Sequence, residues 1–205
     1  MSENAAIGFE YGYNIQTPER LVIWEAQYGD FANGAQAIID EFIVSARDKW
    51  AQLPSLVMLL PHGHEGQGPD HTSGRPERFL QSAADNNLRL AYPTSAAQIF
   101  HLLRRQALLL RTDPLPLVVL TPKGLLRSPS VASSLQELST GKWQPMLVDA
   151  TADPASVRRV ILCSGRVYFD LKDALAKSSN AAQVLVIRVE QLYPLPVDEI
   201  ADALS

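Results

Sequence analysis

The chain has 205 residues, of which 46% are hydrophobic and 20% charged, so it is long and apolar enough to build a folded core. Its net charge is −4 and its Lys and Arg residues are scattered, which argues against a nucleic-acid partner. It shows no signal-peptide pattern and no apolar run long enough to span a membrane, and its single cysteine, Cys163, excludes a disulfide framework. We therefore expect a soluble, intracellular protein.

The first predicted element is a helix at the N-terminus. Ser2 is a suitable N-cap, and the residues after it suit a helix. Glu3 falls in the first turn, where a carboxylate usually does no more than stabilise the helix dipole. From the pattern alone, a catalytic role for Glu3 is the less favoured reading.

The second predicted element is a strand over residues 21–24, followed by a turn and a helix that continues to Ile43. Tyr28 and Phe31 lie at the junction between them. In an open parallel sheet this junction is at the carboxyl end of the strand, where ligands bind. From the pattern alone, ordinary core packing is the favoured explanation for two aromatic residues here, with ligand binding as the alternative.

Residues 62–75 hold the densest group of titratable and turn-forming residues in the chain. They follow an apolar run, residues 56–60, that fits a strand buried on both faces. Catalytic groups are often carried on loops that a rigid strand holds in place, and histidine is a frequent catalytic residue. The pattern favours an active-site loop, with a solvated loop as the alternative.

A metal site is a further alternative for this loop, because His62, His64, Asp70 and His71 are all possible ligands. Zinc ligands on one segment usually lie two to four residues apart, with a more distant third. Here the chain would have to fold back on itself to bring His71 round. The spacing therefore argues against a metal.

Strands alternate with helices through the rest of the chain, which predicts an α/β domain with a mainly parallel sheet. In the helix after residue 95, His101, Arg104 and Arg105 are expected mostly at the surface. The remaining expected elements are a helix over 77–86, a strand over 88–92, a helix over 96–110, a strand over 115–120, a linker over 124–154, a strand over 159–163, a helix over 168–177 and a strand over 184–189.

Several segments, in order along nearly the whole chain, resemble the first component of 2-oxoglutarate dehydrogenases. The segments that carry the resemblance are Ser2-Glu3, Gly8-Phe9-Glu10-Tyr11-Gly12-Tyr13, residues 23–33, the loop 62–73, His101-Leu102-Leu103-Arg104-Arg105-Gln106, Pro122-Lys123, Leu125-Leu126-Arg127 and residues 188–194. This family is transketolase-like and thiamine diphosphate-dependent. It decarboxylates 2-oxoglutarate and transfers the succinyl group to a lipoyl arm.

The resemblance implies a domain organisation and a set of site residues. Residues 1–150 would be the transketolase-like pyrimidine-binding domain with its linker, and residues 151–205 the start of the transketolase C-terminal α/β domain. Glu3 would be the catalytic glutamate that hydrogen-bonds the aminopyrimidine ring and relays a proton. Tyr28 and Phe31 would pack against that ring.

The resemblance also assigns roles to the histidines of the loop. His71 would lie near the thiazolium carbon and stabilise or protonate charged intermediates. His64 would assist it. His62 would either maintain the loop or position the substrate.

One part of the family's machinery has no counterpart in this sequence. The motif that binds the diphosphate and magnesium belongs to a separate upstream domain, so the resemblance implies that this chain is a fragment or one half of a split enzyme, inactive alone.

The resemblance also implies partners. The expected partners are a second subunit in a homodimer or the missing diphosphate-binding half, and a lipoyl-bearing succinyltransferase. The expected location is the cytoplasm of a bacterium or the mitochondrial matrix of a eukaryote. A 2-oxoadipate dehydrogenase component and a non-catalytic dimerisation or assembly module are the alternatives.

Overall fold

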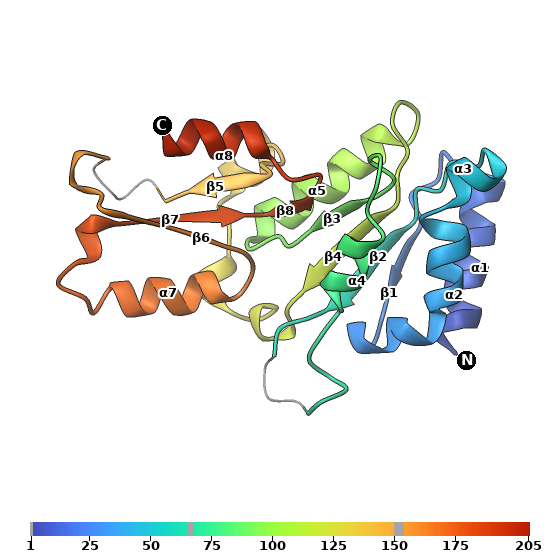
Figure 1. The fold of residues 1–205 in the computed structure, drawn as a ribbon, viewed down its shortest axis with the longest axis horizontal. Coiled ribbons are helices and arrows are strands. Elements are labelled where there is room, and N and C mark those ends of the chain that lie inside the picture. Colours follow the sequence, from blue (N-terminus) through green and yellow to red (C-terminus); the bar gives the residue numbers. More distant parts are fainter. Residues whose placement is uncertain (1, 65–67, 150–153) are drawn as a thin grey trace.

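The computed structural model describes residues 2–64, 68–149 and 154–205, which form two sheets with helices packed around them (Figure 1). The first sheet has the strand order β1-β2-β4-β3-β8, and the second has the order β5-β7-β6. The two termini lie at opposite ends of the molecule in this view. No helix in the described ranges is long and apolar enough to cross a membrane.

The first sheet is parallel except at one edge. Pairing is parallel between β1 and β2, β2 and β4, and β4 and β3, whereas β8 runs antiparallel to β3. Its strands are β1 (Ile23–Glu25), β2 (Val57–Pro61), β3 (Arg89–Ala91), β4 (Leu117–Thr121) and β8 (Gln191–Tyr193). The predicted α/β class with a mainly parallel sheet is confirmed.

Successive residues of the central strands face two different cores. Met58 and Leu60 of β2 belong to the core on the side of the N-terminal helix, whereas Val57 packs with Leu102 and Trp143 on the opposite side. This alternation follows from the two-residue period of a strand. A sheet with both faces buried needs strands that are apolar throughout, which explains the uninterrupted apolar runs in the sequence.

Several helices begin close to the residues that the sequence indicates, but the helix expected over 77–86 ends at Gln81, since Asp85 and Asn86 adopt left-handed backbone conformations. Ser2 caps the first helix by accepting a hydrogen bond from Ala5 N at 3.3 Å, as expected. The α-helices are α1 (Glu3–Gln16), α2 (Gln36–Ile38), α3 (Ala46–Trp50), α4 (Pro76–Gln81), α5 (Ala96–Leu109), α6 (Leu135–Thr140), α7 (Val167–Leu175) and α8 (Val197–Leu204). The 3-10 helices are η1 (Gly29–Ala35), η3 (Lys123–Leu125), η4 (Pro129–Val131), η5 (Pro154–Ser156) and η6 (Ala181–Gln183), and Ile39–Ile43 (η2) is a π-helix.

The second sheet shows where the expected linker differs from the structure. Its strands are β5 (Met146–Val148), β6 (Arg159–Cys163) and β7 (Val184–Val189), and β5 pairs antiparallel with β7. Residues 146–148 therefore form an edge strand, and α6 also lies within the segment expected to be a linker. The expected boundary between residues 150 and 151 lies outside the described residues.

One surface prediction in α5 is wrong. His101 is only 3% exposed, and its Nε2 donates to the Glu137 carbonyl at 2.8 Å. The chain after α6 passes close to this face of α5, and this coverage comes from tertiary packing. The helical period alone had predicted a solvent-exposed position for His101, because it carries no information about the segment that covers this face.

Candidate active site

The carboxyl ends of the parallel strands bring several polar and aromatic residues to one edge of the sheet. Tyr28 follows β1, His62 follows β2, Tyr92 follows β3 and Lys123 follows β4. Parallel strands end at a common edge, and in open α/β sheets this edge is the usual place for a ligand.

Tyr28, Phe31 and His71 form a ring cluster at this edge. The His71 ring lies 4.4 Å from the Tyr28 ring and 5.6 Å from the Phe31 ring, measured between centroids, with interplanar angles of 88° and 83°. The Tyr28 and Phe31 rings are 6.2 Å apart at 87°. All three side chains are half-buried, so each keeps a surface that a ligand can reach. The structure thus brings together three of the predicted site residues.

The loop that carries His71 is fastened by hydrogen bonds near both of its ends. Gly63 N and His64 N both donate to the Thr72 carbonyl, at 2.8 and 3.2 Å. The buried carboxylate of Asp30 accepts from Ser73 N at 3.0 Å. These contacts hold the loop against η1, the element that carries Phe31. Glu65, Gly66 and Gln67, in the same loop, lie outside the described residues.

His62 acts as a hydrogen-bond acceptor within this loop. Its Nδ1 accepts from Gly74 N at 3.0 Å, which requires that nitrogen to be unprotonated. Burial, together with the nearby His64, lowers the pKa of His62 below its ordinary value. The neutral imidazole is therefore favoured, in agreement with the hydrogen bond. The His64 ring is 5.9 Å from that of His62, on an exposed side chain.

Lys123 is a residue of this edge to which the sequence analysis gave no role. Its Nζ lies 3.5 Å from the centroid of the Tyr28 ring and donates to the Gln27 carbonyl at 2.5 Å. With Tyr28, His62 and His71 it lines a small hollow. Its position, two residues beyond a buried parallel strand, was the available signal.

Glu3 lies in the first turn of α1, beside η1. Its Oε2 is 3.8 Å from the point where a Cβ on Gly34 would stand. Within the described residues, the structure gives the Glu3 side chain no hydrogen bond or ion pair. The carboxylate thus lies beside the short helix that carries Phe31, and no described residue engages it.

The residues at this edge suit one kind of organic ligand. Half-buried aromatic rings with a nearby free carboxylate fit a flat, hydrogen-bonding heterocycle such as an aminopyrimidine. Over the described ranges, no group of three or more His, Cys, Asp or Glu residues is placed to hold a metal ion.

Comparison with known protein families agrees with this geometry. Residues 1–129 match the family described as "Transketolase, pyrimidine binding domain". The chain belongs to this family. Residues 132–205 match a second family, described as "2-oxoglutarate dehydrogenase C-terminal". A transketolase-like pyrimidine-binding fold, with thiamine diphosphate as the cofactor of the family, is therefore supported for the part of the chain that carries Glu3, Tyr28, Phe31 and His71.

Curated relatives with high identity extend the match over the whole chain. The 2-oxoglutarate dehydrogenase E1 component of Bacillus pumilus is 55% identical over 100% of this chain, and that of Azotobacter vinelandii is 50% identical over 100%. The Bacillus subtilis protein of the same name is 53% identical over 98% of the chain. In each case the chain spans 22% of the length of the relative.

Proposed function

We propose that this chain is the pyrimidine-binding part of the thiamine diphosphate-dependent component of a 2-oxoglutarate dehydrogenase. The observation that carries the proposal is the cluster of His71, Tyr28 and Phe31 at the carboxyl edge of the sheet, with Glu3 beside η1. The relatives that match the whole chain carry this enzyme's name, which supports 2-oxoglutarate over 2-oxoadipate as the substrate.

The proposed roles follow from where each side chain lies. Phe31 and Tyr28 hold the aminopyrimidine ring by packing against it. Glu3 accepts and returns a proton at a ring nitrogen. Its carboxylate is available for this role, since no described residue engages it. When bound, thiamine diphosphate supplies a nucleophilic carbon and an electron sink for the decarboxylation of a 2-oxo acid.

The histidines act on the substrate side of the ring cluster. His71 is held by the Tyr28 ring and is placed to donate a proton or a hydrogen bond to developing negative charge. His64 is exposed and assists from the same loop. His62 maintains the loop through its bond from Gly74, and its neutral ring borders the hollow in which the substrate would be positioned.

The proposed site is completed by groups that other chain segments supply. Diphosphate and magnesium would be held by a diphosphate-binding domain, provided by a longer chain, a separate subunit or the second copy in a homodimer. The succinyl group would pass to a lipoyl-bearing succinyltransferase. Within this chain we propose residues 1–150 as the pyrimidine-binding domain with its connection, and residues 151–205 as the beginning of the C-terminal domain.

The test is decarboxylation of 2-oxoglutarate by this chain mixed with a matching diphosphate-binding segment, thiamine diphosphate and Mg²⁺. We expect Glu3→Gln to lower the rate by about 10²- to 10⁴-fold, the usual worth of a positioned acid or base. Glu10→Gln, on the same helix, is the matched control and should keep the rate. A second readout is the affinity for thiamine diphosphate, measured by quenching of protein fluorescence.

Two results would contradict the proposal. A mixture that associates and binds the cofactor but does not decarboxylate 2-oxoglutarate would favour the assembly-module alternative. Equal rates for Glu3→Gln and Glu10→Gln would remove Glu3 from the proton relay while leaving the enzyme assignment in place.

A further inference from the structure

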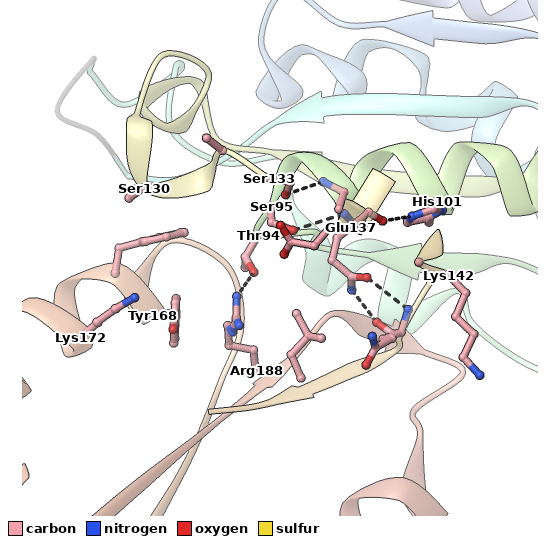
Figure 2. A pocket seen from close by; sticks show the side chains of 17 residues that line it. Thr94, Ser95, His101, Ser130, Ser133, Glu137, Lys142, Tyr168, Lys172 and Arg188 are labelled. Carbon is pink, nitrogen blue, oxygen red and sulfur yellow. Dashed lines mark hydrogen bonds between the residues drawn. The ribbon is translucent and has the colours of Figure 1, made fainter. Parts of the chain in front are cut away.

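A second cavity lies at the junction of the two sheets, apart from the candidate active site. Its volume is about 290 Å³ (Figure 2). Its lining comes from the start of α5, the segment 130–144, α7 and β7, so it joins residues of the first sheet's helices to residues of the second sheet. None of its lining residues belongs to the cluster of Tyr28, Phe31 and His71.

The charged side chains that line this cavity are mainly cationic. Lys142, Lys172 and Arg188 border it, against one carboxylate, Glu137. Within the described parts of the chain, none of the three cations forms an ion pair. Glu137 is directed to the start of its own helix, where its carboxylate accepts from Ser134 N at 2.6 Å. The lining therefore carries more positive than negative charge, and the buried carboxylate of Glu190 offsets part of the charge of Arg188 from behind the cavity wall.

Arg188 is held in a fixed position at the wall of the cavity. Its Nη1 donates to Thr94 Oγ1 at 3.0 Å, and its Cζ lies 4.1 Å from the centroid of the Tyr168 ring. Its Nε is buried with no hydrogen-bond partner among the described residues, so the protein itself leaves part of the guanidinium unsatisfied. A cation fixed in this way loses little side-chain entropy when an anion binds.

The start of α5 adds a favourable dipole and hydroxyl groups. Ser95, which lines the cavity, is the N-cap of this 14-residue helix, so the positive end of the helix dipole faces the same space. Ser130 and Ser133 also line the cavity, and Ser133 Oγ accepts from Ala97 N at 3.0 Å, which holds its hydroxyl at the start of α5. Figure 2 shows Ser95 and Ser133 close together across from Arg188, with Ser130 farther away.

We propose that this cavity binds a small phosphate-bearing molecule. A phosphate group suits a helix N-terminus, a fixed arginine and two exposed lysines, because these groups together offer charge and several donors. The volume is at the lower end of the range for ligand sites, which limits the ligand to a compact molecule. Because the donors come from both sheets, the bound anion would connect the two parts of the chain.

The test is titration of this chain with inorganic phosphate and with pyrophosphate by isothermal calorimetry, at constant ionic strength. We expect saturable binding, tighter for pyrophosphate, because it carries more charge to the same donors. Lys142→Gln combined with Lys172→Gln should weaken binding by about tenfold or more, since two exposed cations are lost from the site. Both lysines are exposed, so the fold should be preserved.

The matched control is Arg158→Gln combined with Lys177→Gln, which removes the same charge from exposed positions that do not line the cavity. This variant should bind within about twofold of the original chain. Amide shifts on binding, measured by NMR, should include Ser95, Ser133 and Arg188. Absence of saturable binding, equal weakening in both double variants, or shifts confined to another surface would each overturn the proposal.

Discussion

Gly29 lies where two segments of backbone cross beneath the candidate active site. A Cβ at this position would stand 2.5 Å from Gly74 Cα and 2.6 Å from the Pro61 carbonyl oxygen. Both contacts are with backbone, which cannot turn aside as the end of a side chain can. Gly29 therefore permits the close approach that holds η1 against the loop of His71.

We expect Gly29→Ala to lower the free energy of unfolding by about 1–3 kcal/mol, the usual cost of overpacking. The measurement is urea denaturation followed by circular dichroism. Gly12→Ala is the matched control, because a Cβ there meets no heavy atom within 4 Å and the residue lies inside α1. That variant should gain up to about 1 kcal/mol from helix propensity. An equal effect of the two changes would mean that the crossing relaxes freely.

For individual residues, the sequence indicated some candidate site residues and missed the contacts of others, and the difference has a physical reason. The strand-to-helix junction drew attention to Tyr28 and Phe31 and the density of the loop to its histidines, but the roles predicted for Tyr28, Phe31 and His71 came from the family resemblance. The position of Lys123 after a buried strand indicated the carboxyl edge of the sheet, but its contact with the Tyr28 ring could not be predicted, because that contact depends on how the strands are ordered in the sheet. His101 was placed wrongly because coverage of one face of α5 by the chain after it leaves no periodic signal.

Among the elements, α1 is tied to the sheet at the end opposite to Glu3. Asn14 and Ser55, both fully buried, exchange two hydrogen bonds: Asn14 Nδ2 donates to Ser55 Oγ at 2.9 Å, and Ser55 N donates to Asn14 Oδ1 at 2.8 Å. Ser55 lies just before β2. The pair therefore sets how α1 sits against the strand that leads into the active-site loop.

We expect Asn14→Ala to lower the free energy of unfolding by about 1–3 kcal/mol, because Ser55 N would be left buried without its acceptor. Gln16→Ala, at an exposed position of the same helix, should change it by no more than about 0.5 kcal/mol. Chemical denaturation of both variants checks this difference. A loss for Asn14→Ala no larger than that for Gln16→Ala would show that water replaces the missing acceptor.

The elements that the sequence did not indicate are short or depend on distant partners. Strands β5 and β8 have three residues each and gain their identity only by pairing with β7 and β3. The helix expected before Ile43 is divided into η1, α2 and a π-helix, since the turn after β1 also has to meet the loop of His71. Long apolar runs, in contrast, predicted β2, β4, β6 and β7 closely. In β2 and β4 these runs reflect burial on both faces of the strand, whereas β6 is apolar without being fully buried.

On the scale of the whole molecule, the two sheets are joined through the chain that leaves β7. Glu190 lies between β7 and β8 and is fully buried. Its carboxylate accepts from Thr94 N at 2.8 Å and from Thr94 Oγ1 at 2.5 Å, and its backbone N donates to the Pro145 carbonyl at 2.8 Å. One residue thus links the start of α5 with the segment that enters β5.

The carboxylate of Glu190 makes the stability of this junction depend on pH. Burial raises the pKa of Glu190 above its ordinary value, although the hydrogen bonds from Thr94 and the nearby Arg188 oppose the shift. A carboxyl whose pKa is higher in the folded state binds its proton more tightly there than in the unfolded chain. Its contribution to stability is therefore full below the unfolded pKa of about 4.3 and is lost as the pH rises through the folded value.

We expect Glu190→Gln to remove this loss, because an amide does not ionise. Between about pH 5 and about pH 8, the free energy of unfolding of the original chain should fall relative to that of Glu190→Gln as the pH rises. Glu199→Gln, at an exposed position of α8, should give a curve parallel to that of the original chain. Denaturant unfolding across this range is the measurement. Parallel curves for the original chain and Glu190→Gln would show that Glu190 titrates alike in the folded and unfolded states, and that the junction is stabilised by its hydrogen bonds without a pH-dependent cost.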